Sequence, residues 1–407
     1  MRASVLAIGD ELLSGKTTNT NATWISQKLM VVGCDVVRHL VVSDDEIEII
    51  ESLNTLFNYK IDLIICTGGL GPTDDDITRK AIFNFFNSDS HFDNDYWEYL
   101  QNKFLSIGYK IPKSNKSQAI IPSNGKVFSN PTGSARGLLF EKNNITLMAL
   151  PGVPSEMQLM IKETVIPWVS KKSKKQNYSI NIRTTGVPES VLFEKINNNN
   201  NLDEIKIGYY PSLLGVDIRI NGSNKKSIKL FEKMIISNVS EYIYTIGEES
   251  LEELVVKKML NSNITISTAE SCTGGLIGHR ITQVPGSSSI YQGGIVSYSN
   301  KSKLAQLNID SNTLKKHGAV SKEVALEMAV NVRTIFDSNI GLSVTGISGP
   351  GGGSIDKPVG LVYAAYCDHN ISKVEKFNFH SNRQSNKFLT SQSALYLILK
   401  NLIKNEK

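Results

Sequence analysis

One stretch of the chain places a hydroxyl where it could act as a nucleophile. Ser271 follows a β-branched run at 264–267 and precedes apolar residues that recur at helical spacing from Leu276, so it is predicted at a strand-to-helix turn. Backbone N–H groups are free at the start of a helix, and Gly274 and Gly275 would let a substrate approach them closely. This is the geometry of a nucleophile beside donors for an oxyanion. The simpler alternative is that Ser271 only caps the helix.

A second stretch combines glycines with carboxylates. Residues 67–76 read Thr-Gly-Gly-Leu-Gly-Pro-Thr-Asp-Asp-Asp. A glycine-rich turn offers backbone donors to phosphate oxygens, and clustered carboxylates hold a hard divalent cation that bridges to those oxygens. The combination suits a diphosphate substrate. The alternative is an ordinary glycine turn whose acidic residues favour the N-terminus of the next helix.

The elements around this second stretch predict a doubly wound α/β layer. Strands are expected at 4–8, 36–42 and 63–66, and helices at 22–32 and 46–57, the second helix with Ile47, Ile50 and Leu53 on one face. Alternating strands and helices build a mostly parallel sheet, and ligands bind at the carboxyl ends of its strands. The acidic residues after the first two strands and the 67–76 run are therefore expected at one edge.

After residue 176 the pattern predicts a small α+β unit. Its expected elements are strands at 179–184, 206–210, 215–221 and near Ile243, with helices at 189–196 and 227–239. No Gly-x-x-Gly sequence occurs between residues 178 and 247 to clamp a nucleic-acid backbone. We therefore interpret this unit as a spacer or dimerisation module.

The last part of the chain predicts a further α/β domain. Helices are expected at 251–260, 320–336 and 388–403, and strands at 264–267, 339–345 and 359–367. A serine nucleophile needs a base to deprotonate it and donors for the oxyanion that its attack creates. No cluster of His, Cys and carboxylate suggests a metal in this part, so no metal is expected there.

Composition sets the outer limits. A chain of 407 residues predicts two or three domains, and its 40% hydrophobic content is ordinary for a globular protein. A net charge of +5 is small for this length and comes without a long basic block, so it argues only weakly for nucleic acid, which we do not expect as a partner. There is no apolar run of about 20 residues and no signal-peptide pattern, so we expect no membrane association and a cytoplasmic location.

The cysteines indicate neither a disulfide framework nor a zinc site. Cys34, Cys66, Cys272 and Cys367 are scattered through the chain without Cys-x-x-Cys spacing. They are expected to be buried thiols. Cys272 adjoins Ser271 and is the alternative candidate for the nucleophile.

Extended motifs in the last domain resemble a known family. Ala-Glu-Ser-Cys-Thr-Gly-Gly at 269–275 is followed in order by Pro-Gly-Ser-Ser at 285–288, Tyr-Ser-Asn-x-x-Lys at 298–303, His-Gly-Ala-Val-Ser at 317–321, a glycine-rich motif at 345–353 and Lys-Pro-Val-Gly at 357–360. This series resembles the C-terminal domain of the CinA family, which is similar to nicotinamide mononucleotide (NMN) deamidases. The middle unit resembles the KH-like module of that family.

The resemblance implies roles for residues of the last domain. Ser271 would be the nucleophile, Lys303 its base, and Tyr298, expected on a strand, would orient the pair or shuttle a proton. Lys303 must be neutral to act, so burial or a neighbouring cation such as Lys301 must lower a pKa that is ordinarily near 10.4. Residues that would bind the substrate and its phosphate are Thr273, Gly274, Gly275, Ser288, Thr345, Gly349, Gly351 and Arg383. Lys387 stands where a second Arg is expected.

The N-terminal motifs resemble the molybdopterin-binding-type domain of the same family. They are Gly-Asp-Glu-Leu-Leu-x-Gly at 9–15, the glycine-and-aspartate run at 67–76 with its continuation to Thr78, Asn-Pro-Thr-Gly at 130–133 and Leu-Pro-Gly-Val-Pro-Ser-Glu-Met at 150–157. In the family this domain is associated with metal-dependent hydrolysis of ADP-ribose. The resemblance implies that a divalent metal of the Mg or Co type is held by Asp74 and Asp75, with Glu11 and Asp44 as weaker candidates.

The implied nucleotide site is built mainly from glycines. Its residues would be Gly9, Gly68, Gly69, Gly71, Asn130, Gly133 and Gly152. Two positions depart from the family pattern, because Ser134 stands where Thr is expected and Arg136 where Pro is expected. These departures bear on the shape of the loop that follows Asn130.

Together the motifs predict a bifunctional enzyme of pyridine-nucleotide salvage. Residues 1–170 would form the ADP-ribose pyrophosphatase domain, 177–247 the KH-like module, and 250–407 the NMN amidohydrolase, in a homodimer. One alternative is a nucleotide-binding scaffold connected with competence or DNA damage. Another is an active deamidase joined to an N-terminal domain that only binds nucleotide.

Overall fold

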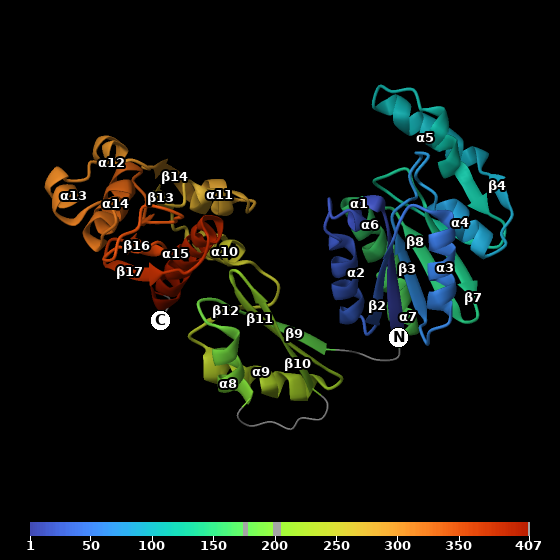
Figure 1. Cartoon of the computed structure of the whole chain (residues 1–407), viewed down its shortest axis with the longest axis horizontal. Coiled ribbons are helices and arrows are strands. Elements are labelled where there is room, and N and C mark those ends of the chain that lie inside the picture. Colours follow the sequence, from blue (N-terminus) through green and yellow to red (C-terminus); the bar gives the residue numbers. More distant parts are fainter. Residues whose placement is uncertain (174–177, 198–204, 406–407) are drawn as a thin grey trace. The chain divides into compact units, whose positions relative to one another are not determined.

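The structure is a computed structural model that describes residues 1–173, 178–197 and 205–405. Its chain divides into two compact units, Met1–Tyr178 and Ser179–Lys407, which are called the N-terminal and C-terminal units below (Figure 1). Both are α/β, as the sequence predicts. No helix among the described residues is long and apolar enough to cross a membrane.

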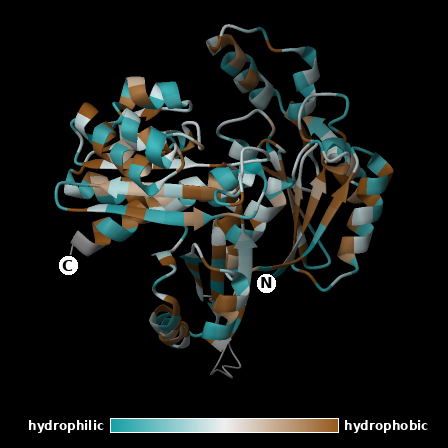
Figure 2. Ribbon diagram, turned by 60° about the vertical axis from the view of Figure 1, so that its left-hand side comes forward, coloured by the Kyte–Doolittle hydropathy of each residue, from teal (hydrophilic) through white to brown (hydrophobic). Residues whose placement is uncertain are grey.

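A six-stranded sheet in the order β2-β1-β3-β8-β7-β6 forms the centre of the N-terminal unit. The first four strands in that order are mutually parallel, and β7 and β6 complete the sheet in antiparallel pairing. The strands are β1 (Arg2–Ile8), β2 (Asp35–Val42), β3 (Leu63–Thr67), β6 (Lys126–Phe128), β7 (Gly137–Lys142) and β8 (Ile145–Leu150). These strands are rich in apolar residues (Figure 2). Helices cover both faces of the sheet, so side chains on either side of a strand are buried.

One face packs against α2, α6 and α7, and the other against α3 and α4. The helices of the unit are α1 (Asp10–Leu13), α2 (Thr20–Val31), α3 (Glu46–Phe57), α4 (Thr78–Phe85), α5 (Asn94–Ser106), α6 (Pro154–Met160) and α7 (Ile166–Lys172), with a π turn at Ile161–Val165 and a 3₁₀ segment at Lys113–Ala119. A small pair of strands, β4 (Ser90–Phe92) and β5 (Ile120–Pro122), flanks α5.

The predicted apolar face of α3 is correct for Leu53, which is fully buried, and for Ile50, which packs against the core, but wrong for Ile47, which is 67% exposed. The helix also buries Ile49 and Leu56. Ile47 lies in the first turn, two residues after the capping residue Asp45, whose side chain accepts a hydrogen bond from the Ile47 N–H. The i, i+4, i+7 spacing of the three buried residues defines a face rotated away from Ile47.

The first part of the C-terminal unit is a four-stranded sheet in the order β10-β11-β9-β12. Its elements are β9 (Tyr178–Thr184), α8 (Glu189–Asn197), β10 (Ile205–Ser212), β11 (Gly215–Gly222), α9 (Lys225–Val239) and β12 (Ile243–Ile246). Side chains connect this sheet to the last helix of the chain: Gln392 Nε2 donates to Thr185 Oγ1 (3.3 Å) and Tyr396 Oη donates to the Glu241 carbonyl (2.7 Å).

The second part is a five-stranded sheet in the order β14-β13-β15-β16-β17. The strands are β13 (Ile266–Glu270), β14 (Tyr291–Val296), β15 (Ile340–Gly346), β16 (Leu361–Cys367) and β17 (Ser372–Asn378), the last of which the sequence analysis did not predict. The helices are α10 (Leu251–Ser262), α11 (Leu276–Thr282), α12 (Asn300–Leu307), α13 (Ser311–His317), α14 (Lys322–Ile335) and α15 (Arg383–Asn405), with a 3₁₀ turn at Ser287–Ser289. β13 lies between its parallel neighbours β14 and β15, so its carboxyl end opens on the edge where ligands bind in such sheets.

Candidate functional sites

Ser271 lies directly after β13, in the turn that leads to α11. Its backbone N–H donates to the Val344 carbonyl on the neighbouring strand (3.0 Å). Gly274 and Gly275 take φ values of +66° and +96°, a backbone conformation that glycine adopts without steric cost. The turn therefore holds the Ser271 hydroxyl at the carboxyl end of a central strand.

Glu270, the last residue of β13, organises this turn. Its buried carboxylate accepts hydrogen bonds from the Thr273 hydroxyl (2.6 Å) and from the backbone N–H groups of Gly275 (3.0 Å), Ile277 (3.1 Å) and Gly278 (2.9 Å). Glu270 thus takes up the free donors at the start of α11. The Thr273 hydroxyl and the Gly275 N–H, expected to bind substrate, are used inside the protein instead.

Donors for an oxyanion remain immediately after the nucleophile. Among the described residues, the backbone N–H groups of Cys272 and Thr273 donate to no carbonyl and to no side chain of another residue. Two adjacent N–H groups beside an attacking oxygen can stabilise a tetrahedral oxyanion. The Cys272 thiol is buried, and burial raises its pKa to about 12, so at neutral pH it stays protonated and is a poor nucleophile.

Lys303 on α12 faces Ser271. Its ammonium donates to Ser271 Oγ (2.8 Å) and to the Ser297 carbonyl (2.7 Å), and the residue is 1% exposed. Burial lowers the pKa of Lys303 from its ordinary value of 10.5 to about 8, because an ammonium loses its hydration inside the protein. Burial is the cause of the shift, and Lys301 does not contribute to it.

Tyr298 lies between β14 and α12, not on a strand as predicted, and is 58% exposed. Its hydroxyl accepts a hydrogen bond from Arg383 Nη2 (2.6 Å), and Arg383 Nη1 donates to the Gly349 carbonyl (2.8 Å). Among the described residues, no hydrogen bond joins Tyr298 to Ser271 or Lys303. Tyr298 holds Arg383 in place, and its role toward the two buried side chains stays a prediction.

Two cations of α15 lie near the nucleophile turn and the glycine-rich loop. Arg383 contacts Gly349, and a Cβ atom added to Gly274 would lie 3.8 Å from Lys387 Nζ. Between them the buried Asn386 donates to the carbonyls of Ser348 (3.1 Å) and Ser381 (2.9 Å), which fixes the loop to the start of the helix. The arrangement offers positive charge to an anionic group of a substrate.

Three further predicted residues stand apart from this arrangement. Thr345 is fully buried and its hydroxyl donates to the Ala319 carbonyl (2.7 Å), so the prediction that it binds substrate is not supported by its contacts. Ser288 is exposed on the 3₁₀ turn Ser287–Ser289. Gly351 lies in open space, because an added Cβ would meet nothing within 4 Å.

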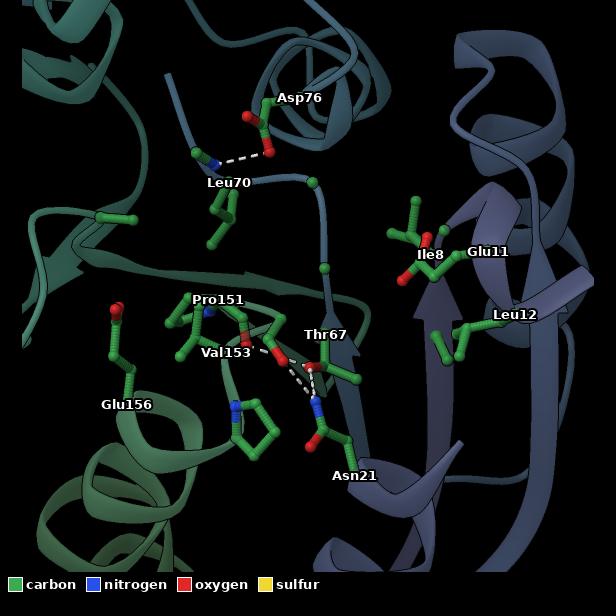
Figure 3. Close-up of a pocket in the computed structure, with 18 of the residues that line it drawn as sticks. Ile8, Glu11, Leu12, Asn21, Thr67, Leu70, Asp76, Pro151, Val153 and Glu156 are labelled. Carbon is green, nitrogen blue, oxygen red and sulfur yellow. Dashed lines mark hydrogen bonds between the residues drawn. The ribbon is translucent and has the colours of Figure 1, made fainter. Parts of the chain in front are cut away.

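In the N-terminal unit a cavity of about 460 Å³ opens at the carboxyl ends of β1, β3 and β8 (Figure 3). Most of the residues predicted to bind nucleotide or metal line this cavity. They are Gly9, Glu11, Asp44, Gly68, Gly69, Gly71, Asp75 and Gly152. A cavity therefore lies at the sheet edge where the strand pattern predicts a ligand site. Asn21 and Glu156 also line it and are not among the residues predicted from the sequence.

Gly68 and Gly69 are required by the close packing of the turn after β3. A Cβ at Gly68, where φ is +112°, would lie 2.0 Å from the Ile8 carbonyl oxygen, and one at Gly69 would lie 2.2 Å from Thr78 Oγ1. Asn21 Nδ2 donates to the Gly152 carbonyl (2.7 Å) across the cavity floor. Figure 3 shows Asn21 and Thr67 joined in this network.

Three predicted residues do not line the cavity. Asn130 is buried and holds its own loop, because its side chain donates to Glu156 Oε2 (2.6 Å) and to the Ala135 carbonyl (3.0 Å) and accepts from the Gly133 N–H (2.9 Å). Gly133 serves the same turn. Asp74 is exposed outside the lining residues.

Glu11, Asp44 and Asp75 suit a divalent cation by donor type, because hard cations prefer carboxylate oxygens. The pKa of Asp44 is raised chiefly by burial, and the charges of Asp10, Glu11 and Asp75 add to the effect, so a cation would relieve their repulsion. Among the described residues, however, no group of three or more His, Cys, Asp or Glu side chains is already gathered as a metal site. Asp76 instead accepts from the Gly71 and Thr73 N–H groups (2.7 and 2.9 Å) and shapes the loop.

Comparisons with known proteins place both units. Residues 248–402 match the family model described as CinA C-terminal domain, and residues 4–171 match the one described as probable molybdopterin binding domain. A protein of Clostridium botulinum (strain ATCC 19397 / Type A) described as competence-damage inducible is 39% identical over 409 residues, which cover 99% of this chain and 100% of the relative. One of Halothermothrix orenii with the same description is 39% identical over 416 residues, 99% of each chain.

A solved structure also matches. The competence/damage inducible protein from Agrobacterium tumefaciens is 36% identical, with 38% of this chain and 96% of that chain covered and a TM-score of 0.36. The two relatives, in contrast, align along nearly the whole chain. On that similarity, together with its two matched domains, the chain belongs to the CinA family of competence-damage inducible proteins.

Proposed function

We propose that the C-terminal unit hydrolyses the amide of NMN to nicotinate mononucleotide and ammonia through Ser271 and Lys303. The single observation that supports this most is the 2.8 Å contact between Lys303 Nζ and Ser271 Oγ, both inside the protein. A lysine with a pKa near 8 is partly neutral at physiological pH, as a general base must be.

In the proposed reaction neutral Lys303 takes the proton of the Ser271 hydroxyl while Oγ attacks the amide carbon. The oxyanion that forms accepts hydrogen bonds from the N–H groups of Cys272 and Thr273. The Lys303 ammonium, held by the Ser297 carbonyl, then gives its proton to the departing nitrogen, which leaves as ammonia. Water activated by the same lysine hydrolyses the resulting ester and restores Ser271.

The substrate's phosphate suits the cationic start of α15. Arg383 and Lys387 offer guanidinium and ammonium donors there, and an Arg can bind two phosphate oxygens at once. This placement explains why a nucleotide amide, and not a simple neutral amide, is the proposed substrate.

The test is ammonia release from NMN by the wild type and by Ser271→Ala and Lys303→Ala, each with and without chelator. Lys301→Ala is the matched control, because Lys301 is an exposed lysine on the same helix. The proposal expects release that survives chelator and the Lys301 change but is lost in both active-site variants. Wild-type protein that is folded and releases no ammonia would contradict it.

We propose further that the N-terminal cavity hydrolyses ADP-ribose with a divalent metal of the Mg or Co type. The glycine turn after β3 and the carboxylates of Glu11, Asp44 and Asp75 support this proposal, since the bound metal would neutralise charge on the diphosphate. Asp44→Asn and Asp75→Asn are expected to abolish hydrolysis, whereas Asp74→Asn, outside the lining, is the matched control.

The competing proposal is an N-terminal domain that only binds nucleotide. It is motivated by Ser134 and Arg136, which depart from the family pattern in the loop that follows Asn130. Calorimetric titration with ADP-ribose, in parallel with the hydrolysis assay, separates the two. Saturable binding without turnover at any metal concentration would establish the binding-only domain.

A further inference from the structure

Arg280 lies inside the C-terminal unit, where three helices meet. It belongs to α11, the helix that follows the nucleophile turn, and it is 6% exposed. Its Nη2 donates to Glu252 Oε2 of α10 (2.7 Å) and to Gln392 Oε1 of α15 (2.8 Å), and its Nη1 donates to Ser391 Oγ of α15 (2.9 Å). The guanidinium therefore joins α11 to both neighbouring helices.

The contacts of Arg280 resist rearrangement. Glu252 compensates its charge in an ion pair, and the planar fork of the guanidinium fixes the directions in which the other acceptors must lie. If α15 moved against α11, at least one of these bonds would break. A buried, charged donor would then be left unpaired, which costs free energy.

The two helices that Arg280 joins carry opposite sides of the proposed amidase site. The turn at 271–275 leads directly into α11, and Glu270 holds the donors at the start of that helix. α15 begins at Arg383 and also carries Lys387, the two cations proposed to bind the substrate's phosphate. A Cβ added to Gly274 would lie 3.8 Å from Lys387 Nζ, so the turn and the start of α15 are close. The distance between nucleophile and phosphate site therefore depends on how α11 packs against α15.

Apolar packing between α11 and α15 fixes this distance less well than directed bonds do. Ile277 of α11 and Leu395 of α15 belong to one apolar core. Apolar contacts are non-directional, whereas a hydrogen bond weakens steeply when its donor and acceptor move out of line. Arg280 supplies three directed bonds across these helices, and two of them end on α15.

The same network continues into the four-stranded sheet. Gln392 accepts from Arg280 through Oε1 and donates through Nε2 to Thr185 Oγ1 (3.3 Å). The Thr185 hydroxyl in turn donates to the Leu214 carbonyl (2.7 Å). Because both ends of its amide are used, Gln392 keeps its oxygen on Arg280.

We propose that Arg280 is a positioning residue for the amidase site. It fixes the distance between Ser271, where the amide reacts, and the start of α15, where the phosphate binds, and it touches neither end of the substrate. This inference rests on the proposed NMN hydrolysis. NMN spans both places and gains from the fixed distance, whereas nicotinamide riboside, which lacks the phosphate, does not.

Arg280→Lys tests the proposal, because a lysine keeps the charge opposite Glu252 but has one nitrogen in place of the planar fork. Ammonia release from NMN and from nicotinamide riboside is measured for the wild type and the variant. We expect kcat/KM for NMN to fall at least tenfold, chiefly through a higher KM, because binding energy from the phosphate is lost. For the riboside it should fall less than threefold.

Arg333→Lys is the matched control. It makes the same chemical change on α14, which packs on the opposite face of the sheet, where Arg333 Nη1 contacts His369 Nδ1 (3.1 Å). Both substrates should stay within threefold of the wild type. Circular dichroism establishes that each variant is folded. Equal losses with NMN and the riboside in Arg280→Lys would indicate a general structural effect and overturn the proposal, as would unchanged kinetics with NMN.

A binding measurement makes the test independent of turnover. Titration calorimetry with NMN compares Ser271→Ala with the double variant that also carries Arg280→Lys, and we expect the affinity of the double variant to be at least tenfold lower. Equal affinities would overturn the role of Arg280. Binding without ammonia release by the wild type would contradict the proposed hydrolysis alone, and the ratio of the two affinities would still decide the role of Arg280. Absence of NMN binding would overturn both.

Discussion

Lys303 connects the stability of the C-terminal unit to its proposed activity. Burial lowers the pKa of Lys303 from 10.5 to about 8, so the folded protein holds this proton less tightly than the unfolded chain does. The unfolded chain therefore binds more protons between about pH 8 and pH 10.5, and stability increases as the pH rises through that interval. At neutral pH the buried ammonium costs about 3 kcal/mol of folding free energy.

A Lys303→Met variant isolates this effect, because the difference between wild type and variant cancels most other titrating groups. Between pH 7 and pH 9.5 the wild type should gain about 2 kcal/mol of unfolding free energy relative to Lys303→Met. Urea unfolding followed by circular dichroism measures the gain. Tryptophan fluorescence identifies the N-terminal transition, because Trp24, Trp97 and Trp168 all lie in that unit.

The same pKa should govern activity. The kcat/KM for NMN reports ionisations of the free enzyme, so it should rise about tenfold per pH unit below pH 8 and level off above it, as Lys303 becomes neutral. A rising limb centred near pH 10.5, or a stability difference that stays constant between pH 7 and pH 9.5, would refute the assignment of Lys303 as a buried base.

Three other perturbations follow from the geometry. Glu270→Gln places an NH₂ group opposite the N–H and O–H groups that now donate to the carboxylate, so one of these donors loses its acceptor. The change should lower the free energy of unfolding by about 3 kcal/mol and lower kcat more than it raises KM. Unchanged urea unfolding would contradict this. Gly68→Ala introduces a Cβ 2.0 Å from the Ile8 carbonyl oxygen. It should lower the free energy of unfolding of the N-terminal unit by at least about 1 kcal/mol, which would appear as a tryptophan-detected transition at lower urea concentration. An unshifted transition would mean that the turn adapts. All four cysteines are buried free thiols, so a thiol reagent should react with none in the native protein and with four in urea. Fast labelling of native Cys272 would show that the nucleophile turn opens.

The alternation of strands and helices was sufficient to predict the α/β class and the edge on which Glu11, Asp44 and the 67–76 turn meet. Such predictions succeed because a parallel sheet must bring the carboxyl ends of its strands together. The turn that holds Ser271 was equally visible, since its signals are local. Lys303 is 32 residues away in sequence, and only the family resemblance selected it.

Other roles depend on tertiary contacts that no spacing reveals. Glu270 looks like an ordinary strand residue, yet it takes the helix donors that the sequence analysis assigned to the substrate. Thr345 lies on a strand covered on both faces, so its hydroxyl meets the Ala319 carbonyl and not a ligand. Asn130 and Gly133 belong to the nucleotide motif by pattern, but they form the turn of their own loop.

The most direct test of the central claim is to trap the acyl-enzyme that Ser271 would form. Hydroxylamine added with NMN should divert part of the product to the nicotinate mononucleotide hydroxamate in the wild type and in Lys301→Ala, with no hydroxamate from Ser271→Ala. Hydroxamate from the wild type and Lys301→Ala, and none from Ser271→Ala, would establish that the reaction passes through an acyl-enzyme on Ser271. Undiminished hydroxamate or ammonia from Ser271→Ala would contradict it, because the amide would then be attacked without Ser271.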